Sequence, residues 1–473
     1  MVTSQRRPWS ARRCWAPYRV IIPGAAGVSM LIASVLPWFT NPSGTRLIAW
    51  QLPVDLGWQL RSGMFNYGLI CACCALYIFY VTRQTWLVLR AQNSADPTYL
   101  LAAPRVSLTQ NYIQAGLLCL VPMVLFLFQF LCADMVTVAD VTRQQIQLEL
   151  ARTHLGYQAT PEFTPILPFT LHESHIAGRL AMLTNQLSPG WFVPLISMAI
   201  LFTAKVFLPM RIRLLPLAFP TLRSERRRRN WLLGVAVLLG LIIFGRAPAA
   251  LACQAQADHF LNVGEYTNAL NWLDHARTLN PSFEQSLEYH IARGKAWYFL
   301  HPQQPNAESA VYLGDYYRSQ NDVYSAYQAL QNSWNTYAHT PWLRDEVSLS
   351  LIQMAELSRP LRSIPKNSLV SNEPALPWLT ELLKIDDTNF YAHFTIGRIL
   401  YDLHDYSGCE AHMRMVLNII SSPEMQSAAY TYIAMSRFDS GDISNAREYL
   451  YKAQNLDPAY RNNTARQHMS GMR

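Results

Sequence analysis

The polar cluster with the clearest metal-binding chemistry is His172-Glu173-Ser174-His175. Two histidines three residues apart can share one face of a helix, and His154 or Glu162 could complete a zinc shell. The cluster matches no established metal motif, however, and a solvated helix within a loop is the better explanation. We therefore predict neither a metal site nor a resident cofactor.

A second group of possible ligands is Cys71-Ala72-Cys73-Cys74. This spacing resembles that of metal-binding cysteines, but no second Cys or His pair accompanies it. The group also lies inside an apolar run, where cysteine acts as a small packing residue. The eight cysteines of the chain form no disulfide pattern, so we interpret this group as packing.

No sequence motif for catalysis accompanies these clusters. The chain contains no H-E-x-x-H, no G-x-S-x-G and no phosphate-binding glycine loop. Arg and His in an outward loop could hold a lipid-linked phosphate, which leaves open a membrane enzyme or transporter, for example for glycan or lipid transfer. Because no acidic catalytic pair is evident, we predict that the protein is not an enzyme.

The composition indicates that part of the chain lies in lipid. Of its 473 residues, 51% are hydrophobic and only 15% are charged, whereas soluble proteins carry about 25% charged residues. Residues 1–253 hold 22 Lys and Arg against 8 Asp and Glu, and residues 254–473 hold 17 against 23. The basic residues lie in short runs between apolar segments, which is typical of topology control. We therefore predict no binding to nucleic acid.

Five apolar stretches approach the ~20 residues that cross a bilayer. They are residues 19–39, 64–82, 113–133, 191–210 and 231–250. Together they predict a membrane domain over residues 19–252, after a basic cytoplasmic tail at 1–18. A long outward loop at 134–190, with a helix expected near 138–155, could cap this domain or contact the C-terminal domain.

The arginines predict the orientation of these spans. Fifteen arginines lie in the N-terminal tail and in the loops 83–112 and 211–230, against five in the loops 40–63 and 134–190. The positive-inside rule then places the N-terminus in the cytoplasm, and five crossings place the C-terminal domain outside it. The compact loops, and the lack of eukaryotic targeting signals, predict a prokaryotic plasma membrane.

A helical periodicity replaces the apolar runs from about residue 250 onward. Two segments share the spacings four, three and five: Ala269, Leu273, Ala276 and Pro281, and then Ala446, Leu450, Ala453 and Pro458. Gly264 and Gly441 each lie five residues before the first alanine. Small residues at these points let two helices pack closely, and the proline ends the second helix.

This pattern resembles the tetratricopeptide repeat (TPR), a 34-residue helix–turn–helix unit. In that register the repeats lie at 250–283, 307–340, 390–423 and 427–460. Half a degenerate unit fits at 284–300, and helices out of register are expected at 341–389. The resemblance implies an all-α fold, in which about five transmembrane helices precede a TPR-like α-solenoid over residues 253–473.

Ligands of this family usually lie along the concave face formed by the first helix of each pair. The matching positions here are Asp315, Arg318, Tyr391, Phe394, Arg398, Tyr401, Met435 and Phe438. Aromatic residues and Arg are favoured at binding hot spots, but the same side chains could instead pack against the next repeat. The Lys and Asn pairs with which some family members clamp a peptide carboxylate are missing, so such a clamp is not expected.

Together these features predict a membrane-anchored protein that binds a protein or peptide partner at the concave face outside the cytoplasm. Its other partner is the lipid bilayer. The alternative is a membrane enzyme or transporter that uses the repeats as an accessory. A third interpretation is a structural subunit that assembles through its membrane helices.

Overall fold

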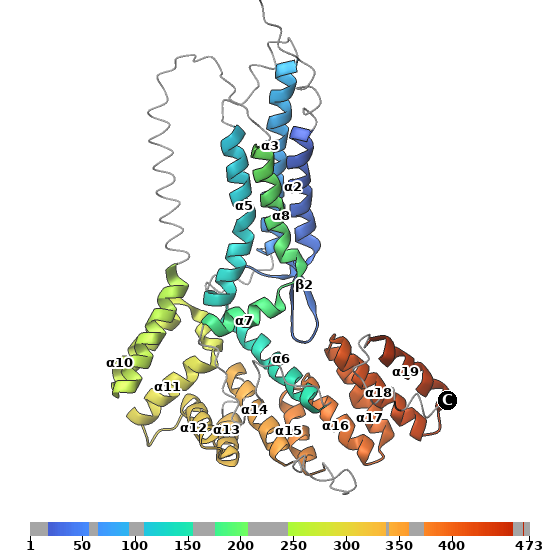
Figure 1. The fold of residues 1–473 in the computed structure, drawn as a ribbon. Helices are drawn as coiled ribbons and strands as arrows, with labels where there is room; N and C mark the ends of the chain where they lie inside the picture. Colours follow the sequence, from blue (N-terminus) through green and yellow to red (C-terminus); the bar gives the residue numbers. More distant parts are fainter. Residues whose placement is uncertain are drawn as a thin grey trace, which may run out of the picture. The chain divides into compact units, whose positions relative to one another are not determined.

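The computed structural model describes residues 18–55, 65–93, 108–154, 176–206, 245–336, 340–358, 373–456 and 467. The chain divides into two compact units. The apolar unit comprises residues 1–40, 46–133 and 183–246, and the repeat unit comprises residues 41–45, 134–182 and 247–473. Helices dominate the described parts of both units (Figure 1).

Four helices make up most of the described part of the apolar unit: α2 (Tyr18–Val35), α3 (Tyr67–Asn93), α5 (Leu108–Phe128) and α8 (Pro189–Val206). Helix α2 packs against α3 and α8, and α5 packs against the same two helices. Each helix therefore has two neighbours, and the four form a closed ring (Figure 1). A π-helical turn, η2 (Gln129–Ala133), extends α5.

Side chains of the apolar unit are arranged with small residues inside and large aliphatic residues outside. The buried small residues include Ala26, Ala33, Cys71, Ala75 and Cys119. The exposed large residues include Ile21, Val28, Leu31, Ile32, Val35, Leu76, Leu117, Val124 and Ile196. Polar groups pair between helices, as Ser29 Oγ does with Ser197 Oγ at 2.5 Å. Small residues at such interfaces allow the backbones of neighbouring helices to approach closely.

The five predicted spans are corrected to two candidate spans among the described residues, Tyr67–Leu87 and Asn111–Ala133. The apolar helices Val20–Val35 and Pro189–Ala204 are shorter than this length criterion requires. The first predicted span is interrupted because its helix ends at Val35 and a strand begins at Pro37, a residue that cannot donate to a helix. Most of the fifth predicted span, 231–250, and the end of the fourth lie outside the described residues.

A β-hairpin follows α2. Strands β1 (Pro37–Thr40) and β2 (Arg46–Ile48) pair antiparallel, with Phe39 opposite Leu47, and η1 (Ala49–Gln51) follows. The hairpin tip, residues 41–45, belongs to the repeat unit. There Ser421 N donates a hydrogen bond to Ser43 O at 2.6 Å. Gly44 has a φ of +88°, and a Cβ at this position would lie 2.5 Å from the Ser421 backbone, so only glycine fits.

The repeat unit is a stack of helices in which each helix packs against the next from α10 to α19 (Figure 1). The stack begins with a helical segment over residues 245–263, of which residues 247–263 belong to the repeat unit. The helices that follow are α10 (Tyr266–Leu279), η3 (Pro281–Gln285), α11 (Leu287–Leu300), α12 (Ala307–Ser319), α13 (Val323–Thr336), α14 (Pro341–Leu357), η4 (Glu373–Ala375), α15 (Leu376–Ile385), α16 (Phe390–Asp402), α17 (Tyr406–Ile419), α18 (Pro423–Asp439) and α19 (Ile443–Leu456). Each of the four predicted repeats is a helical hairpin, and α11, α14 and α15 are the additional helices.

All four hairpin turns share one backbone conformation. A residue with positive φ lies two positions before the second helix: Gly264 (87°), Asn321 (61°), His404 (62°) and Gly441 (89°). Five residues further on, each second helix buries a small side chain: Ala269, Ala326, Cys409 and Ala446. The middle repeats therefore keep the same turn without glycine, because Asn and His tolerate the left-handed region better than most residues do.

Helix α6 (Met135–His154) also belongs to the repeat unit, although in sequence it directly follows the apolar helix α5 and its extension η2. Asp134, the single residue between η2 and α6, accepts a hydrogen bond from Thr137 N at 2.9 Å and so caps the new helix. Helix α6 packs against α16 and η3. Four of its side chains, Ile146, Leu148, Leu150 and Ala151, share one hydrophobic core with residues of α13 to α18.

Candidate partner-binding surfaces

The first predicted groove residues lie on α12. Arg318 is 3% exposed and forms an ion pair with Glu346 of α14, which is 1% exposed. Burial raises the pKa of Glu346, although the charge of Arg318 opposes this shift. Asp315 lies 3.9 Å from Arg318 and keeps a partly exposed side chain. Arg318 thus joins two helices of the stack, and Asp315 is the more accessible of the two.

On α16, Tyr391 and Phe394 have no exposed surface. The hydroxyl of Tyr391 donates to Glu356 of α14. The ring of Phe394 meets that of Tyr432 edge-on, with centroids 6.0 Å apart. The guanidinium of Arg398 lies 6.0 Å from the centroids of both these rings. These residues join α16 to its neighbours on both sides.

The remaining predicted residues complete a small aromatic surface beside Tyr432. Tyr401 OH donates to Asp439 at 2.6 Å. Burial and, after it, this carboxylate raise the pKa of Tyr401. Met435 is buried, whereas Phe438 is half-buried. Of the eight predicted residues, the structure gathers Phe394, Arg398 and Tyr401 around Tyr432, and it leaves accessible surface on Asp315, Arg398, Tyr401 and Phe438.

Helix α6 occupies the inner side of the stack between η3 and α16 (Figure 1). Residues 146–151 of α6 are all buried. One helical turn takes 3.6 residues, so more than a full turn of α6 is enclosed on every side. A cavity of about 60 Å³ lies beside it, between α6, α11 and α14. Arg143 of α6 pairs there with Asp345 of α14 at 2.7 Å.

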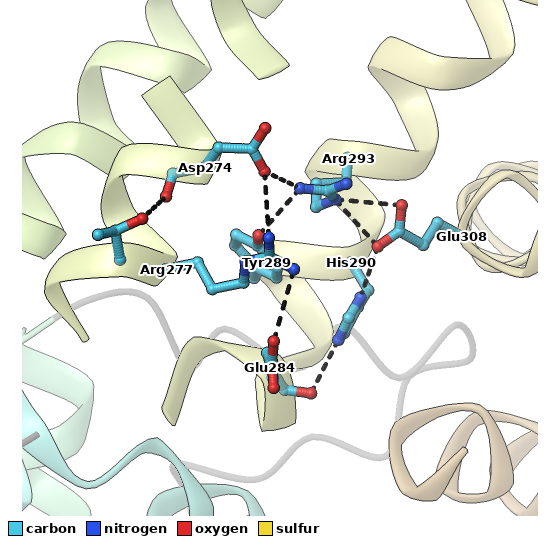
Figure 2. A network of polar contacts seen from close by, with 8 residues as sticks. Asp274, Arg277, Glu284, Tyr289, His290, Arg293 and Glu308 are labelled. Atoms are coloured by element: carbon cyan, nitrogen blue, oxygen red, sulfur yellow. Dashed lines mark hydrogen bonds and ion pairs between the residues drawn. The ribbon is translucent and has the colours of Figure 1, made fainter. Parts of the chain in front are cut away.

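A polar network joins the first helices of the repeat unit (Figure 2). Arg293 of α11 donates to Glu308 of α12 at 3.0 Å and also pairs with Asp274 of α10. His290 Nδ1 lies 3.1 Å from Glu308 Oε1, and its ring stacks on Trp342 with centroids 3.9 Å apart. Burial would raise the pKa of Glu308, but the hydrogen bond to His290 and the charge of Arg293 together lower it.

This network was missed in the sequence because its members are far apart along the chain and match no motif. It links α10, α11, α12 and α14 through side chains that are buried or partly buried, apart from the exposed Asp274, and it therefore helps to fix the packing of these helices. Within the described residues, no three His, Cys, Asp or Glu side chains are grouped so that they could hold a metal ion. The His172–His175 cluster lies outside the described residues.

A row of aromatic rings runs across α10, α11 and α12. Tyr266 and Phe299 stack with centroids 4.8 Å apart. Tyr298 lies 5.7 Å from Tyr312, which in turn lies 6.4 Å from Tyr316. Phe299 is 47% exposed and Tyr316 is 48% exposed. Contiguous exposed aromatic surface is typical of protein interaction sites, and we call these five residues the aromatic row.

No protein-family model matches the chain, and no curated protein matches it. Similar solved structures include MamA of AMB-1, at 14% identity over 44% of this chain and 92% of that chain, with a TM-score of 0.22. The pilF protein of Pseudomonas aeruginosa is 15% identical over 48% of this chain and 99% of that chain, with a TM-score of 0.28. YrrB, described as a TPR protein with an unusual peptide-binding site, is 14% identical over 47% of this chain and 92% of that chain, with a TM-score of 0.23. At these scores the assignment of helical repeats rests on the hairpins of this chain itself.

Proposed function

We propose that this chain is a membrane-anchored scaffold that presents its repeat unit, outside the cytoplasm, to a protein partner. The observation that supports the proposal is which segments of the chain make up the repeat unit. Its described parts come from three ranges of the sequence: the hairpin tip at 41–45, residues 134–154 and 176–182, which hold α6 and the start of α7 (Ile176–Gln186), and the stack of helices from residue 247 onward. Segments that pack together must lie on the same side of a membrane.

The predicted topology requires this same grouping. It assigns the loops 40–63 and 134–190 and the C-terminal domain to the outer side, from the arginine distribution together with five crossings, of which two are candidate spans among the described residues. The two candidate spans, Tyr67–Leu87 and Asn111–Ala133, separate the first of these segments from the second. Two crossings return the chain to the side from which it started, which agrees with the hydrogen bond between the hairpin tip and Ser421.

The surface of the apolar unit supports a lipid environment. Its ring of helices exposes large aliphatic side chains, for example Ile21 at 60% and Leu76 at 68%, and buries alanine, cysteine and serine. Exposing apolar surface to water costs about 25 cal/mol per Å², whereas lipid chains cover the same surface at no such cost. Close packing through small residues is also how helices associate in membranes.

The first experiment tests the topology in the full chain. We expect a Gln303→Cys variant to react with a membrane-impermeant maleimide in intact cells. An Ala103→Cys variant, in the loop predicted to be cytoplasmic, should react only after the membrane is permeabilised. Reporter fusions after residues 105, 220 and 300 provide an independent measurement. Labelling of position 303 only after permeabilisation would place the repeat unit in the cytoplasm and reject the proposed side.

The second experiment tests whether the repeat unit binds a partner. The full chain is cross-linked in cells and purified, and the co-purified proteins are identified. We expect the complex to be lost in a variant with Arg398→Ala and Tyr401→Phe, or in a variant with Phe299→Ala and Tyr316→Ala. The Tyr451→Ala variant is the matched control, because Tyr451 is 60% exposed on α19, away from both surfaces. If both double variants keep the wild-type melting temperature and the complex, these surfaces are not the binding site.

A further inference from the structure

We propose that the inner side of the stack is a helix-binding channel whose present occupant, α6, is a built-in competitor of the external partner. The partner that fits is an amphipathic α-helix with aliphatic residues and a basic residue spaced as in α6. This inference rests on the proposed function, because it adds a binding site on the inner side of the stack to the two surfaces named there. The proposed ligand is a helix of another protein.

The stack of helices from α13 to α16 is continuous without α6. Helices α13, α14, α15 and α16 each pack against the next along the chain. Helix α6 is not one of these layers, since it comes from a distant part of the sequence and lies against α16 and η3. Its position is that of a ligand in a superhelical groove, and such grooves are the binding surfaces of helical-repeat proteins.

The charges of the channel wall and of α6 are complementary. The channel wall on α14 carries two adjacent carboxylates that line the cavity beside α6: Glu346, which is paired with Arg318, and Asp345. Arg143 of α6 lies 2.7 Å from Asp345 and 2.8 Å from Asp140 on its own helix. One turn further along, Ile146 enters the hydrophobic core. A basic residue followed after one turn by an aliphatic residue is therefore the recognition pattern of this wall.

Helices α14 and α16, which lie beside α6, also contain buried polar side chains without hydrogen-bond partners among the described residues. Gln353 and Ser350 on α14 and Thr395 on α16 are fully buried. Both side-chain polar atoms of Gln353, and the hydroxyls of Ser350 and Thr395, have no hydrogen-bond partner among the described residues. Buried polar groups without partners weaken an interface. If these atoms can be reached from the channel, a helix that offers them amide or hydroxyl groups binds more tightly than α6.

The test uses the full chain in detergent and a fluorescent peptide with the sequence of residues 134–154. Fluorescence anisotropy measures the affinity of the peptide for the wild-type chain and for a variant with Arg143→Ala and Ile146→Ala, which weakens the resident helix. We expect the variant to bind the peptide at least tenfold more tightly than the wild type, because its channel is easier to vacate. A peptide carrying Ile146→Asp and Leu150→Asp should not bind to either chain.

Two further variants of the full chain complete the test. The single variant Arg143→Ala keeps all apolar contacts of α6 and serves if the double variant does not fold. Tyr451→Ala, remote from the channel, should bind the peptide as the wild type does. If the folded variants bind the peptide no better than the wild type, α6 is a permanent core helix and the inference fails. Maleimide labelling at position 303 is independent of peptide binding, so the topology proposal stands or falls separately.

Discussion

At the scale of residues, buried charge determines how the central helices of the repeat unit are held together. Arg318 and Glu346 are both almost fully buried and lie on different helices, α12 and α14. Removing two charges from water costs several kcal/mol, which their mutual attraction offsets only while both are present. The pair therefore fixes the spacing of the two helices, and the loss of one partner leaves an uncompensated charge in the core.

We predict that Arg318→Met lowers the free energy of unfolding by about 3–5 kcal/mol. Burial already raises the pKa of Glu346, and removing Arg318 raises it further. A carboxyl group with a raised folded pKa gains stability as the pH falls, because the folded state then binds a proton that the unfolded chain releases. The loss in free energy of unfolding, relative to the wild type, should therefore be larger at pH 8 than at pH 5. Urea unfolding followed by circular dichroism measures it.

The double variant Arg318→Met, Glu346→Met is the control for this prediction. It should recover most of the lost stability, because no charge remains buried. If Arg318→Met instead unfolds at the wild-type urea concentration at both pH values, Arg318 has no structural role. It would then remain only a candidate for partner binding.

At the scale of elements, the hairpin turns set the spacing of the repeats. The turn residues Gly264, Asn321, His404 and Gly441 all have positive φ. At Gly441 no atom lies within 4 Å of the point that a Cβ would occupy, so a side chain there meets only backbone strain and no neighbour. The same holds for Gly264. The glycines of these two turns can therefore be substituted without disturbing the core.

We predict that Gly441→Ala lowers the stability of the repeat unit by about 1–2 kcal/mol, which is the cost of the left-handed conformation for an alanine. The substitution His404→Gly should act in the opposite direction and stabilise by about 0.5 kcal/mol, because glycine relieves this strain but is more flexible when unfolded. Thermal unfolding of the two variants beside the wild type measures both effects. Equal melting temperatures for all three chains would contradict the role of the turn.

The hairpins could be predicted from the sequence because their packing is local. The spacing of Ala446, Leu450 and Ala453 reports contacts within one helical pair, and the structure buries all three. The turns at Asn321 and His404 carry no comparable signal, since neither residue type is reserved for positive φ. The additional helices α14 and α15 were expected only as elements out of register.

The candidate site could be predicted only in part. The groove positions implied by the TPR resemblance suggested Phe394, Arg398 and Tyr401, and the structure places these three around Tyr432. Whether such residues are exposed depends on what packs over them, and α6 is distant from α16 in sequence. No local pattern reports a contact of that range. The aromatic row likewise arises from three separate helices, so its continuity is visible only in the folded chain.

At the scale of the whole molecule, the two units are interwoven along the chain. The sequence passes between the apolar unit and the repeat unit at residues 40/41, 45/46, 133/134, 182/183 and 246/247. Because the chain passes between the units five times, they cannot be separated at one position in the sequence, unlike two domains that are joined by one linker. The repeat unit therefore extends beyond the C-terminal half of the chain and includes α6.

We predict that the isolated chain 253–473 is markedly less stable than the repeat unit within the full chain. It lacks Ile146, Leu148 and Leu150, which are buried in the shared core. Three aliphatic side chains at about 1.5–3 kcal/mol each correspond to a loss of roughly 5 kcal/mol or more. Hydrogen exchange of α14 and α16 in the two chains measures this difference. A fusion of residues 134–154 to the isolated chain should restore protection, and equal protection without the fusion would contradict the prediction.

The enclosure of α6 also bears on the order in which the molecule is made. Helix α6 ends at His154, whereas α14, which forms one of its walls, begins at Pro341. At about 5–20 residues per second of translation, the wall follows the enclosed helix by roughly ten to forty seconds. The ribosome thus delivers the inner helix first and its walls afterwards. The repeats can wind around a helix that already exists, and no finished tunnel has to be threaded.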